Sequence, residues 1–286
     1  MPIYSNHFPY EAWERNHQSA KNDGQRIDNQ MRVLGLIAAR GGSKGLPRKN
    51  IRLLCGKPLL EYTAESALSA RRLSLVILTT DDEEIAEVGR RCGLNVPFMR
   101  PAELAADDTP TLPVVQHAIG WMEAHGVFVD AICQLQPTNP LRRPEDIDAC
   151  IESLERSGAD AVMTILPIPA EHNPHWAYFR DDNGELHLCT GEATPIPQRQ
   201  KLPPSFHREG SVYVTRRDVV MKENSLYGKR VIGHLVDPNQ TVNIDGPEDW
   251  ERAEAILSSR LVMAPFVNAP TRRGVNSTPG KMVFPV

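Results

Sequence analysis

Short apolar runs alternate with amphipathic segments from residue 33 to residue 165, and this alternation strongly constrains the fold. The run LVILT at 75–79 is continuously apolar, which is typical of a strand buried on both faces of a parallel sheet. The predicted strands are 33–38, 75–79, 96–99, 131–135 and 161–165, and the predicted helices are 58–70, 81–93, 111–125 and 144–158. Because strand–helix–strand crossovers are right-handed, we predict an α/β fold with a doubly wound, mostly parallel sheet. Ligands of such sheets bind beyond the carboxyl ends of the strands.

The alternation stops after residue 165 and returns near residue 211. The stretch between them is rich in proline, histidine and short polar turns, which favours a small inserted lobe over more sheet. Two further strands, at 211–214 and 231–236, and a helix at 247–257 complete the pattern. We therefore predict a polar N-terminal arm at 1–30, one domain at 31–259 with an inserted lobe at 167–207, and a loose C-terminal tail at 260–286.

Composition excludes several classes of protein. Hydrophobic residues make up 41% of the chain and charged residues 24%, as in ordinary globular enzymes. No apolar run is long enough to cross a bilayer, and the first thirty residues lack an apolar signal core, so we expect neither membrane insertion nor secretion. The five cysteines form no CxxC pair, which indicates reduced thiols and a cytoplasmic protein. An isoelectric point near 6.2 argues against nucleic-acid binding.

The loop after the first predicted strand is strongly cationic. It lies in the segment LIAARGGSKGLPRKN at 36–50, and no acidic residue occurs between Val33 and Leu60. The basic residues of this stretch are Arg40, Lys44, Arg48, Lys49, Arg52 and Lys57. In a chain whose net charge is −4, such a loop is expected to hold an anion. Its glycines let backbone N–H groups approach phosphate oxygens closely.

Two common phosphate-binding motifs do not match this loop. The Walker pattern is absent, because Lys44 precedes Gly45 and no serine or threonine follows. The dinucleotide fingerprint GxGxxG is also absent, since Gly41, Gly42 and Gly45 have a different spacing and Pro47 follows them. The anion is therefore bound in another way.

The predicted strand and the sequence ARGGSKGLPRKN that follows it instead resemble the signature loop of the acylneuraminate cytidylyltransferases, the CMP-sialic acid synthetase family. The resemblance extends from about residue 33 to residue 257. It also rests on the motifs RPAEL at 100–104, LQPTNPLR at 135–142, RQKLP at 199–203, GSVYV at 210–214 and NIDGPED at 243–249. The resemblance implies a Rossmann-like nucleotidyltransferase that joins CTP to a nine-carbon α-keto acid sugar and releases pyrophosphate. It further implies a magnesium ion and a homodimer formed through the inserted lobe.

The resemblance also implies roles for residues of the nucleotide site. Arg40 and Lys44 would be the catalytic cations, which contact the triphosphate and stabilise the leaving pyrophosphate. Asn50 would read the base, because an amide offers both a donor and an acceptor to cytosine. The implied nucleotide-binding set is Ala38, Ala39, Arg40, Gly41, Gly42, Ser43, Lys44, Asn50, Arg100 and Thr111. Arg48 and Lys49 are either part of this site or solvated neighbours, and Thr111 is either a nucleotide contact or a helix-start hydroxyl.

For the sugar, the resemblance implies Gln136, Tyr213 and Arg199, with Arg199 approaching from a partner subunit. A planar guanidinium suits a carboxylate. Two of these residues have a simpler alternative: Arg199 is a solvent-facing side chain, or Tyr213 packs in the core. Arg142, in the same motif as Gln136, is either functional or a turn-stabilising charge.

For the metal, the resemblance implies Asp245 as the main ligand and Asn243 as a weakened one. Family members usually have an aspartate at both positions. Alternation along a strand would put the two side chains on one face. Asp245 is alternatively the cap of the helix that begins near Pro247.

The chain departs from the family pattern at His207 and Glu209 as well as at Asn243. These departures leave the identity of the nonulosonic acid open. They also keep two other functions in view, namely a nucleotide-binding paralogue with weak or no catalysis, and a sugar nucleotidyltransferase that uses another nucleoside triphosphate.

Overall fold

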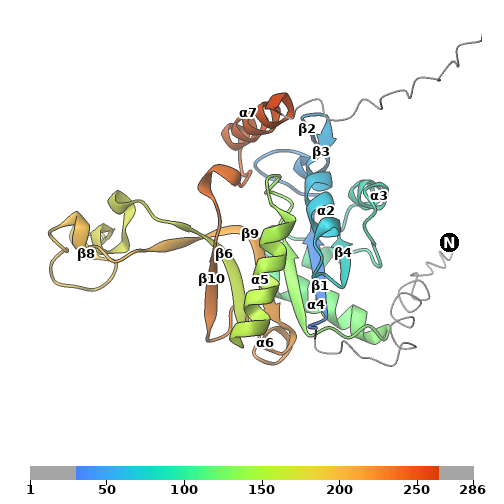
Figure 1. Cartoon of the computed structure of the whole chain (residues 1–286), viewed down its shortest axis with the longest axis horizontal. Helices are drawn as coiled ribbons and strands as arrows, with labels where there is room; N and C mark the ends of the chain where they lie inside the picture. The colour runs from blue at the N-terminus through green and yellow to red at the C-terminus, as the bar shows by residue number, and fades with distance from the viewer. Residues whose placement is uncertain (1–29, 264–286) are drawn as a thin grey trace, which may run out of the picture.

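A computed structural model describes residues 30–263 and shows a sheet covered by helices on both faces (Figure 1). The arm predicted at 1–30 and the tail from residue 264 onward fall almost entirely outside the described residues. The sheet has six strands in the order β10-β6-β9-β5-β1-β4. These strands are β1 (Val33–Ala38), β4 (Leu75–Thr79), β5 (Ala131–Leu135), β6 (Ala161–Pro167), β9 (Phe206–Arg216) and β10 (Val231–Leu235).

Five of the six strands run in the same direction, as the alternating pattern predicts. β1 pairs in parallel with both β4 and β5, and β10 pairs in parallel with β6. β9 lies between β5 and β6 and is antiparallel to both. The sheet is therefore mostly parallel, with one reversed strand near its centre.

Helices on the two faces bury two apolar cores, which makes the sheet doubly wound. One core lies under α2 (Leu59–Ser69), α3 (Glu83–Arg91) and α5 (Pro144–Ser157). The other lies under α4 (Thr111–Ala124) and α6 (Arg217–Lys222). The alternation of side chains along β1 explains the division, because Val33 and Ile37 face the first core while Leu34 and Leu36 face the second.

A third core attaches the C-terminal helix to the loop after β1. The helix α7 (Pro247–Met263) packs Trp250 and Ala253 against Leu46 and Leu54, beside the small hairpin of β2 (Leu53–Leu54) and β3 (Lys57–Pro58). The predicted tail at 260–286 begins too early, since α7 continues to Met263. No glycine or proline interrupts the chain between Pro247 and Pro265, so nothing local ends the helix at 260.

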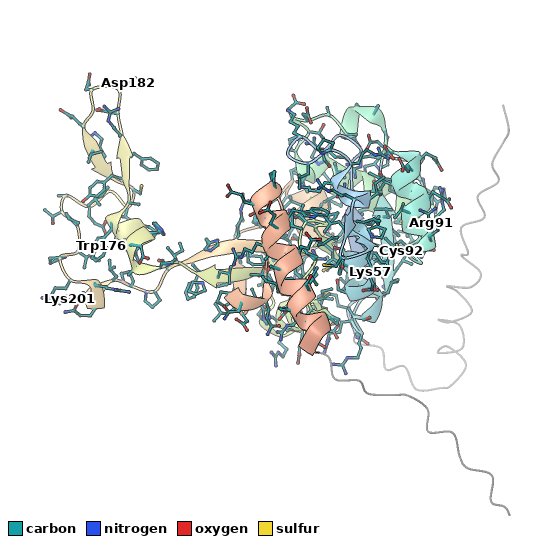
Figure 2. The ribbon with its side chains drawn as sticks, turned by 90° about the horizontal axis from the view of Figure 1, so that it is seen from above. Lys57, Arg91, Cys92, Trp176, Asp182 and Lys201 are labelled. Atoms are coloured by element: carbon teal, nitrogen blue, oxygen red, sulfur yellow. The ribbon has the colours of Figure 1, made fainter. Side chains whose placement is uncertain are left out.

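The segment set apart in the sequence at 167–207 projects from the body as a long arm (Figures 1 and 2). The ends of β6 and β9 form its stem, with an irregularity between Met163 and Ile165. Its outer part carries the hairpin of β7 (Tyr178–Arg180) and β8 (Leu186–Leu188). The arm also contains the short 3-10 helices Ala170–His172, Pro174–Trp176 and Arg199–Lys201.

Two predicted strands differ from the structure. The segment 96–99 forms no strand: isolated bridges join Asn95 to Ile77 and Met99 to Thr80, and Pro97 between them has no N–H to continue a ladder. The strand predicted at 211–214 extends over Phe206–Arg216, since its first part pairs with the outgoing chain in the stem of the arm.

Candidate active site

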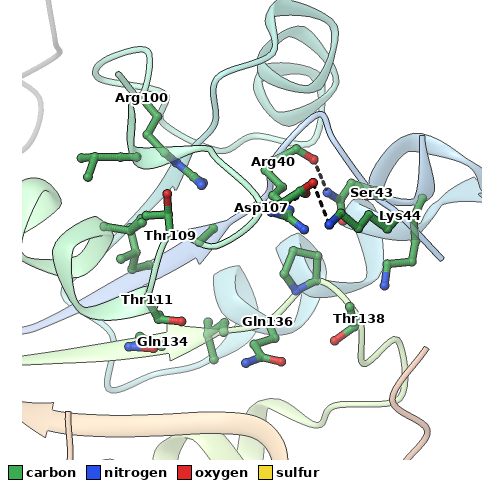
Figure 3. Close-up of a pocket in the computed structure, with 18 of the residues that line it drawn as sticks. Arg40, Ser43, Lys44, Arg100, Asp107, Thr109, Thr111, Gln134, Gln136 and Thr138 are labelled. Atoms are coloured by element: carbon green, nitrogen blue, oxygen red, sulfur yellow. Dashed lines mark hydrogen bonds and ion pairs between the residues drawn. The ribbon is translucent and has the colours of Figure 1, made fainter. Parts of the chain in front are cut away.

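A cavity of about 490 Å³ lies beyond the carboxyl ends of β1 and β5, where the sheet topology predicts a ligand (Figure 3). Its floor is formed by Leu36 and Ala38 of β1 and by Gln134 of β5, and its walls come from loops and from the start of α4. Nine of the predicted site residues line it, namely Ala38, Arg40, Ser43, Lys44, Asn50, Arg100, Thr111, Gln136 and Asp245.

The cationic loop reaches this cavity in a fixed conformation. The Asn50 side chain is buried, and its Nδ2 donates to the Arg40 carbonyl oxygen at 3.0 Å. The backbone N–H of Gly41 donates to Asp81 Oδ1 at 3.1 Å. A β-carbon on Gly45 would come within 2.1 Å of the Asp245 carbonyl oxygen, so this position requires glycine.

The remaining small residues of the loop have different surroundings. Ala39 is buried in the core and donates its N–H to the Thr79 carbonyl oxygen at 3.1 Å, so it does not line the cavity. A β-carbon on Gly42 would meet nothing within 4 Å, which leaves open space around its backbone.

The two predicted catalytic cations share one carboxylate. Arg40 Nη1 lies 3.1 Å from Asp107 Oδ1, and Lys44 Nζ lies 2.9 Å from Asp107 Oδ2 (Figure 3). The hydrogen bond from Lys44 lowers the pKa of the Asp107 carboxyl. Asp107 was not predicted as a site residue, although the acidic pair DD at 107–108 follows the RPAEL motif in the sequence.

Arg48 and Lys49, which the sequence left undecided, point to different places. Arg48 pairs with Asp82 and Glu84 at the start of α3 and does not line the cavity. The side chain of Lys49 is only 13% exposed and lines the cavity. Its Nζ donates to the Ile244 carbonyl oxygen at 2.7 Å, and burial lowers its pKa.

Arg100 and Thr111 approach the cavity from the side of α4. Arg100 is buried and is held by Thr79, whose carbonyl oxygen accepts from Nη2 at 2.6 Å. Burial lowers the pKa of Arg100. Thr111 is the first residue of α4, and the N-cap position is taken by Pro110, which makes no side-chain cap. Thr111 thus stands at the helix start, as one alternative held, and it also lines the cavity.

Gln136 lines the cavity, whereas Arg142 supports the loop from behind. Arg142 is buried, donates to the carbonyl oxygens of Ser211 and Gln136, and reaches Thr63 Oγ1 at 3.0 Å. Burial lowers its pKa to about 10. The turn-stabilising alternative for Arg142 agrees with this geometry.

Tyr213 and Arg199 do not line the cavity. Tyr213 is opposite Gln134 in the pairing of β5 with β9, so it lies on the cavity side of the sheet, and burial raises its pKa. Arg199 is on the arm, in a separate hollow with Asn173 and Pro203. Figure 2 shows that part of the arm, marked by Lys201, well away from the body.

Asn243 and Asp245 do not lie in a strand, contrary to the prediction, and the chain bends at Asp245. The two side chains still lie on one side, because Ile244 between them is buried and Asn243 Nδ2 donates to Asp245 Oδ2 at 3.3 Å. Asp245 does not cap α7: its carboxylate is 77% exposed, and Asp249 accepts from the backbone N–H of Asp245 at 3.0 Å. That alternative for Asp245 is wrong.

These side chains offer oxygen donors of the kind that magnesium prefers. Asp245 supplies a carboxylate, and Asn243 an amide whose oxygen accepts a hydrogen bond from Thr138 Oγ1. Asp245 and Thr138 both line the cavity. The donor set therefore fits a hard divalent cation.

The two other departures from the family pattern lie on β9. Glu209 is a buried carboxylate that accepts hydrogen bonds from Asn139, Thr241 and the backbone N–H of Ser211, the last at 3.0 Å. His207 is exposed, in the stem of the arm. Glu209 thus ties together the loops behind the cavity.

A doubly wound sheet with a cationic, glycine-bearing loop after its first strand defines a nucleotide-binding α/β enzyme. The chain belongs to the cytidylyltransferase family, whose model matches residues 34–256. The family and the enzyme class drawn from the sequence motifs are thus confirmed.

No helix within residues 30–263 has the length and apolar character to traverse a bilayer.

Similar proteins agree with this placement. The CMP-N,N'-diacetyllegionaminic acid synthase of Legionella pneumophila is 31% identical over 228 residues, which cover 79% of this chain and 97% of that protein. The pseudaminic acid cytidylyltransferase of Campylobacter jejuni is 29% identical over 79% of this chain and 96% of its own. The N-acylneuraminate cytidylyltransferase A of Danio rerio is 30% identical over 78% of this chain and 50% of its own.

Solved structures show the same fold. That of CMP:2-keto-3-deoxy-manno-octonic acid synthetase complexed with CTP superposes with a TM-score of 0.61 at 19% identity, covering 80% of this chain and 99% of the other. That of 4-diphosphocytidyl-2C-methyl-D-erythritol synthase from Anaerococcus prevotii gives 0.54 at 14% identity, with coverages of 81% and 98%. The predicted Rossmann-like nucleotidyltransferase fold is confirmed.

Proposed function

We propose that this enzyme transfers CMP from CTP to a nonulosonic acid and releases pyrophosphate. The observation that carries the proposal is the placement of Arg40 and Lys44 side by side at the cavity, joined through Asp107. In this reaction the anomeric oxygen of the sugar attacks the α-phosphorus, the bond to the bridging oxygen breaks, and pyrophosphate leaves. Arg40 and Lys44 stabilise the charge that develops on the leaving group.

Asn50 gives the cavity a preference for cytosine. Its Nδ2 is engaged by the Arg40 carbonyl oxygen, whereas its Oδ1 has no hydrogen-bond partner among residues 30–263. This oxygen can accept from the N4 amine of cytosine. Uracil carries an acceptor at the same position, so UTP would leave two acceptors facing each other.

Asp245 and Asn243 would hold a magnesium ion at the edge of the cavity. A bound magnesium ion would neutralise phosphate charge. Lys49 contributes a fixed charge beside them, since its Nζ lies 3.8 Å from Asp245 Oδ1. Asp245 and the phosphate cations therefore line one cavity, and Asn243 lies behind it, hydrogen-bonded to Asp245 and Thr138.

The arm supports a homodimer. Its outer hairpin exposes large apolar side chains, with Phe179 68% exposed, Leu186 60% and Tyr178 44%. Tyr178 and Leu186 lie on one face of this hairpin and Phe179 on the other, and a concentration of large exposed apolar side chains favours an interface. Dimerisation would carry Arg199 toward the cavity of the other subunit, where its guanidinium could pair with the sugar carboxylate.

We also place the enzyme in the cytoplasm, in keeping with its five free cysteines.

The experiment is a pyrophosphate-release assay with CTP, magnesium and a panel of legionaminic, pseudaminic and N-acetylneuraminic acids. We expect release with at least one of them and little release with UTP or ATP. Binding of CTP without any release would favour the inactive-paralogue alternative, for which Asn243 is the motivating departure. Release with UTP or ATP in preference to CTP would favour another nucleotidyltransferase.

A further inference from the structure

Asp107 forms ion pairs with both cations that the proposed function assigns to the triphosphate. Its two carboxylate oxygens are divided between them, with Oδ1 at 3.1 Å from Arg40 and Oδ2 at 2.9 Å from Lys44. Arg40 Nη1 also donates to the Ala106 carbonyl oxygen at 3.2 Å, so the loop before α4 is docked onto the cationic loop (Figure 3). A bridging carboxylate presents two anionic oxygens to two cations, as a phosphate group does.

The pairing is weak enough to be displaced. The side chain of Lys44 is 72% exposed and that of Asp107 is 49% exposed, and exposed ion pairs contribute little because water and salt screen them. A polyphosphate carries several charges and can take both cations at once. A single monophosphate carries less negative charge, so it compensates less for the ion pairs with Asp107 that it would have to replace.

A second carboxylate occupies the same loop. The backbone N–H of Gly41, which belongs to the nucleotide-binding set that the family resemblance implies, donates to Asp81 Oδ1 at 3.1 Å. Carboxylates thus pair with both kinds of group in this loop that would bind phosphate, namely the side-chain cations and a backbone N–H.

We propose that Asp107 is a built-in competitor for the pyrophosphate end of the nucleotide. It holds Arg40 and Lys44 when no polyphosphate is bound, and takes them back as pyrophosphate leaves. Asp107 therefore weakens pyrophosphate binding more than it weakens CMP binding. This inference rests on the roles proposed for Arg40 and Lys44.

The test measures binding by calorimetry without a divalent cation, using inorganic pyrophosphate and CMP as probes. Asp107→Asn removes the competing carboxylate. Asp108→Asn is the matched control: it removes the same charge from the neighbouring residue, and Asp108 makes no ion pair among residues 30–263. We expect Asp107→Asn to bind pyrophosphate about three- to tenfold more tightly than Asp108→Asn. The affinity for CMP should differ much less between the two variants.

Equal or weaker pyrophosphate binding by Asp107→Asn would overturn the inference. Asp107 is exposed, so both variants should keep the wild-type melting temperature, which the same samples report. The double variant Arg40→Ala/Lys44→Ala separates this outcome from a failure of the proposed function. If that variant binds pyrophosphate like the wild type, the assignment of the cations is wrong; if it loses binding, only the role of Asp107 is in question.

Discussion

The backbone of Gly45 lies so close to Asp245 that a β-carbon on the glycine would come within 2.1 Å of the Asp245 carbonyl oxygen. This contact joins the cationic loop after β1 to the proposed metal-binding segment near the other end of the domain. Lys49 strengthens the junction, since its Nζ donates to the Ile244 carbonyl oxygen at 2.7 Å. The phosphate cations and the proposed metal ligand are thereby held at one cavity.

Gly45→Ala should destabilise the protein by about 1–3 kcal/mol, because the added methyl group forces the two backbone segments apart. Gly42→Ala is the matched control, since its β-carbon would meet nothing within 4 Å, and it should change the free energy of unfolding by less than about 0.5 kcal/mol. Urea denaturation of both variants measures the difference. Equal losses would contradict the close approach.

Arg40→Ala should reduce turnover by about 10²–10³-fold, the usual cost of losing one donor to a developing negative charge. Arg48→Ala should retain turnover within about threefold, because Arg48 pairs with Asp82 and Glu84 outside the cavity. Steady-state pyrophosphate release with saturating CTP compares the two. A similar loss in both variants would mean that the charge of the loop as a whole, and not the position of Arg40, supports catalysis.

Asn243→Asp should lower the magnesium concentration needed for half-maximal activity by about tenfold, since a second carboxylate adds charge to the proposed site. Without metal, the new carboxylate would repel Asp245, because the facing atoms of the present pair are 3.3 Å apart. The melting temperature should consequently rise more on adding magnesium in the variant than in the wild type. An unchanged magnesium dependence would show that residue 243 is not a ligand.

Acidification should lower the free energy of unfolding in part through protonation of Asp146. Burial would raise the pKa of this carboxyl, but hydrogen bonds from His234 and Arg143 outweigh it and lower the pKa from 3.8 to about 2. A folded-state pKa below the unfolded value means that the contribution is complete above about pH 5 and is lost as the pH falls from about 4 to about 2. We expect about 2 kcal/mol from this group.

Asp146→Asn provides the check on that pH dependence. The free energy of unfolding of the wild type, measured by urea denaturation, should fall more steeply between about pH 4 and about pH 2 than that of the variant. Parallel curves for the two proteins would assign the acid sensitivity to other carboxyls.

Arg199→Ala and Arg40→Ala together test whether the arm acts between subunits. Each homodimer should be nearly inactive. A heterodimer isolated by two different tags should recover about half of the wild-type activity, because one of its two cavities then has both arginines. An inactive heterodimer would mean that Arg199 acts in its own subunit, and a fully active Arg199→Ala homodimer would mean that Arg199 has no role in catalysis. A monomeric wild type in light scattering would remove the proposal of a dimer.

Much of the fold was predictable because its signals are local. The apolar runs of β1, β4 and β5 and the acidic start and basic end of α3 lie within single segments. The reversed direction of β9 was not predictable, since it follows from the stem of the arm and from pairing with β5 and β6. Asp107 was missed for a similar reason, because its partners Arg40 and Lys44 lie on another loop.

The sequence by itself determined that a cationic loop follows the first strand of a parallel sheet, since both features are written in consecutive residues. Only the tertiary structure decided which cations serve the cavity. Arg48 and Lys49 are neighbours, yet Arg48 has left-handed backbone angles, with φ of 55°, and pairs with Asp82, 34 residues away. Lys49 points into the cavity and is held by Ile244, 195 residues away. Identical charges were thus assigned different roles by partners that are distant in the chain and close in space.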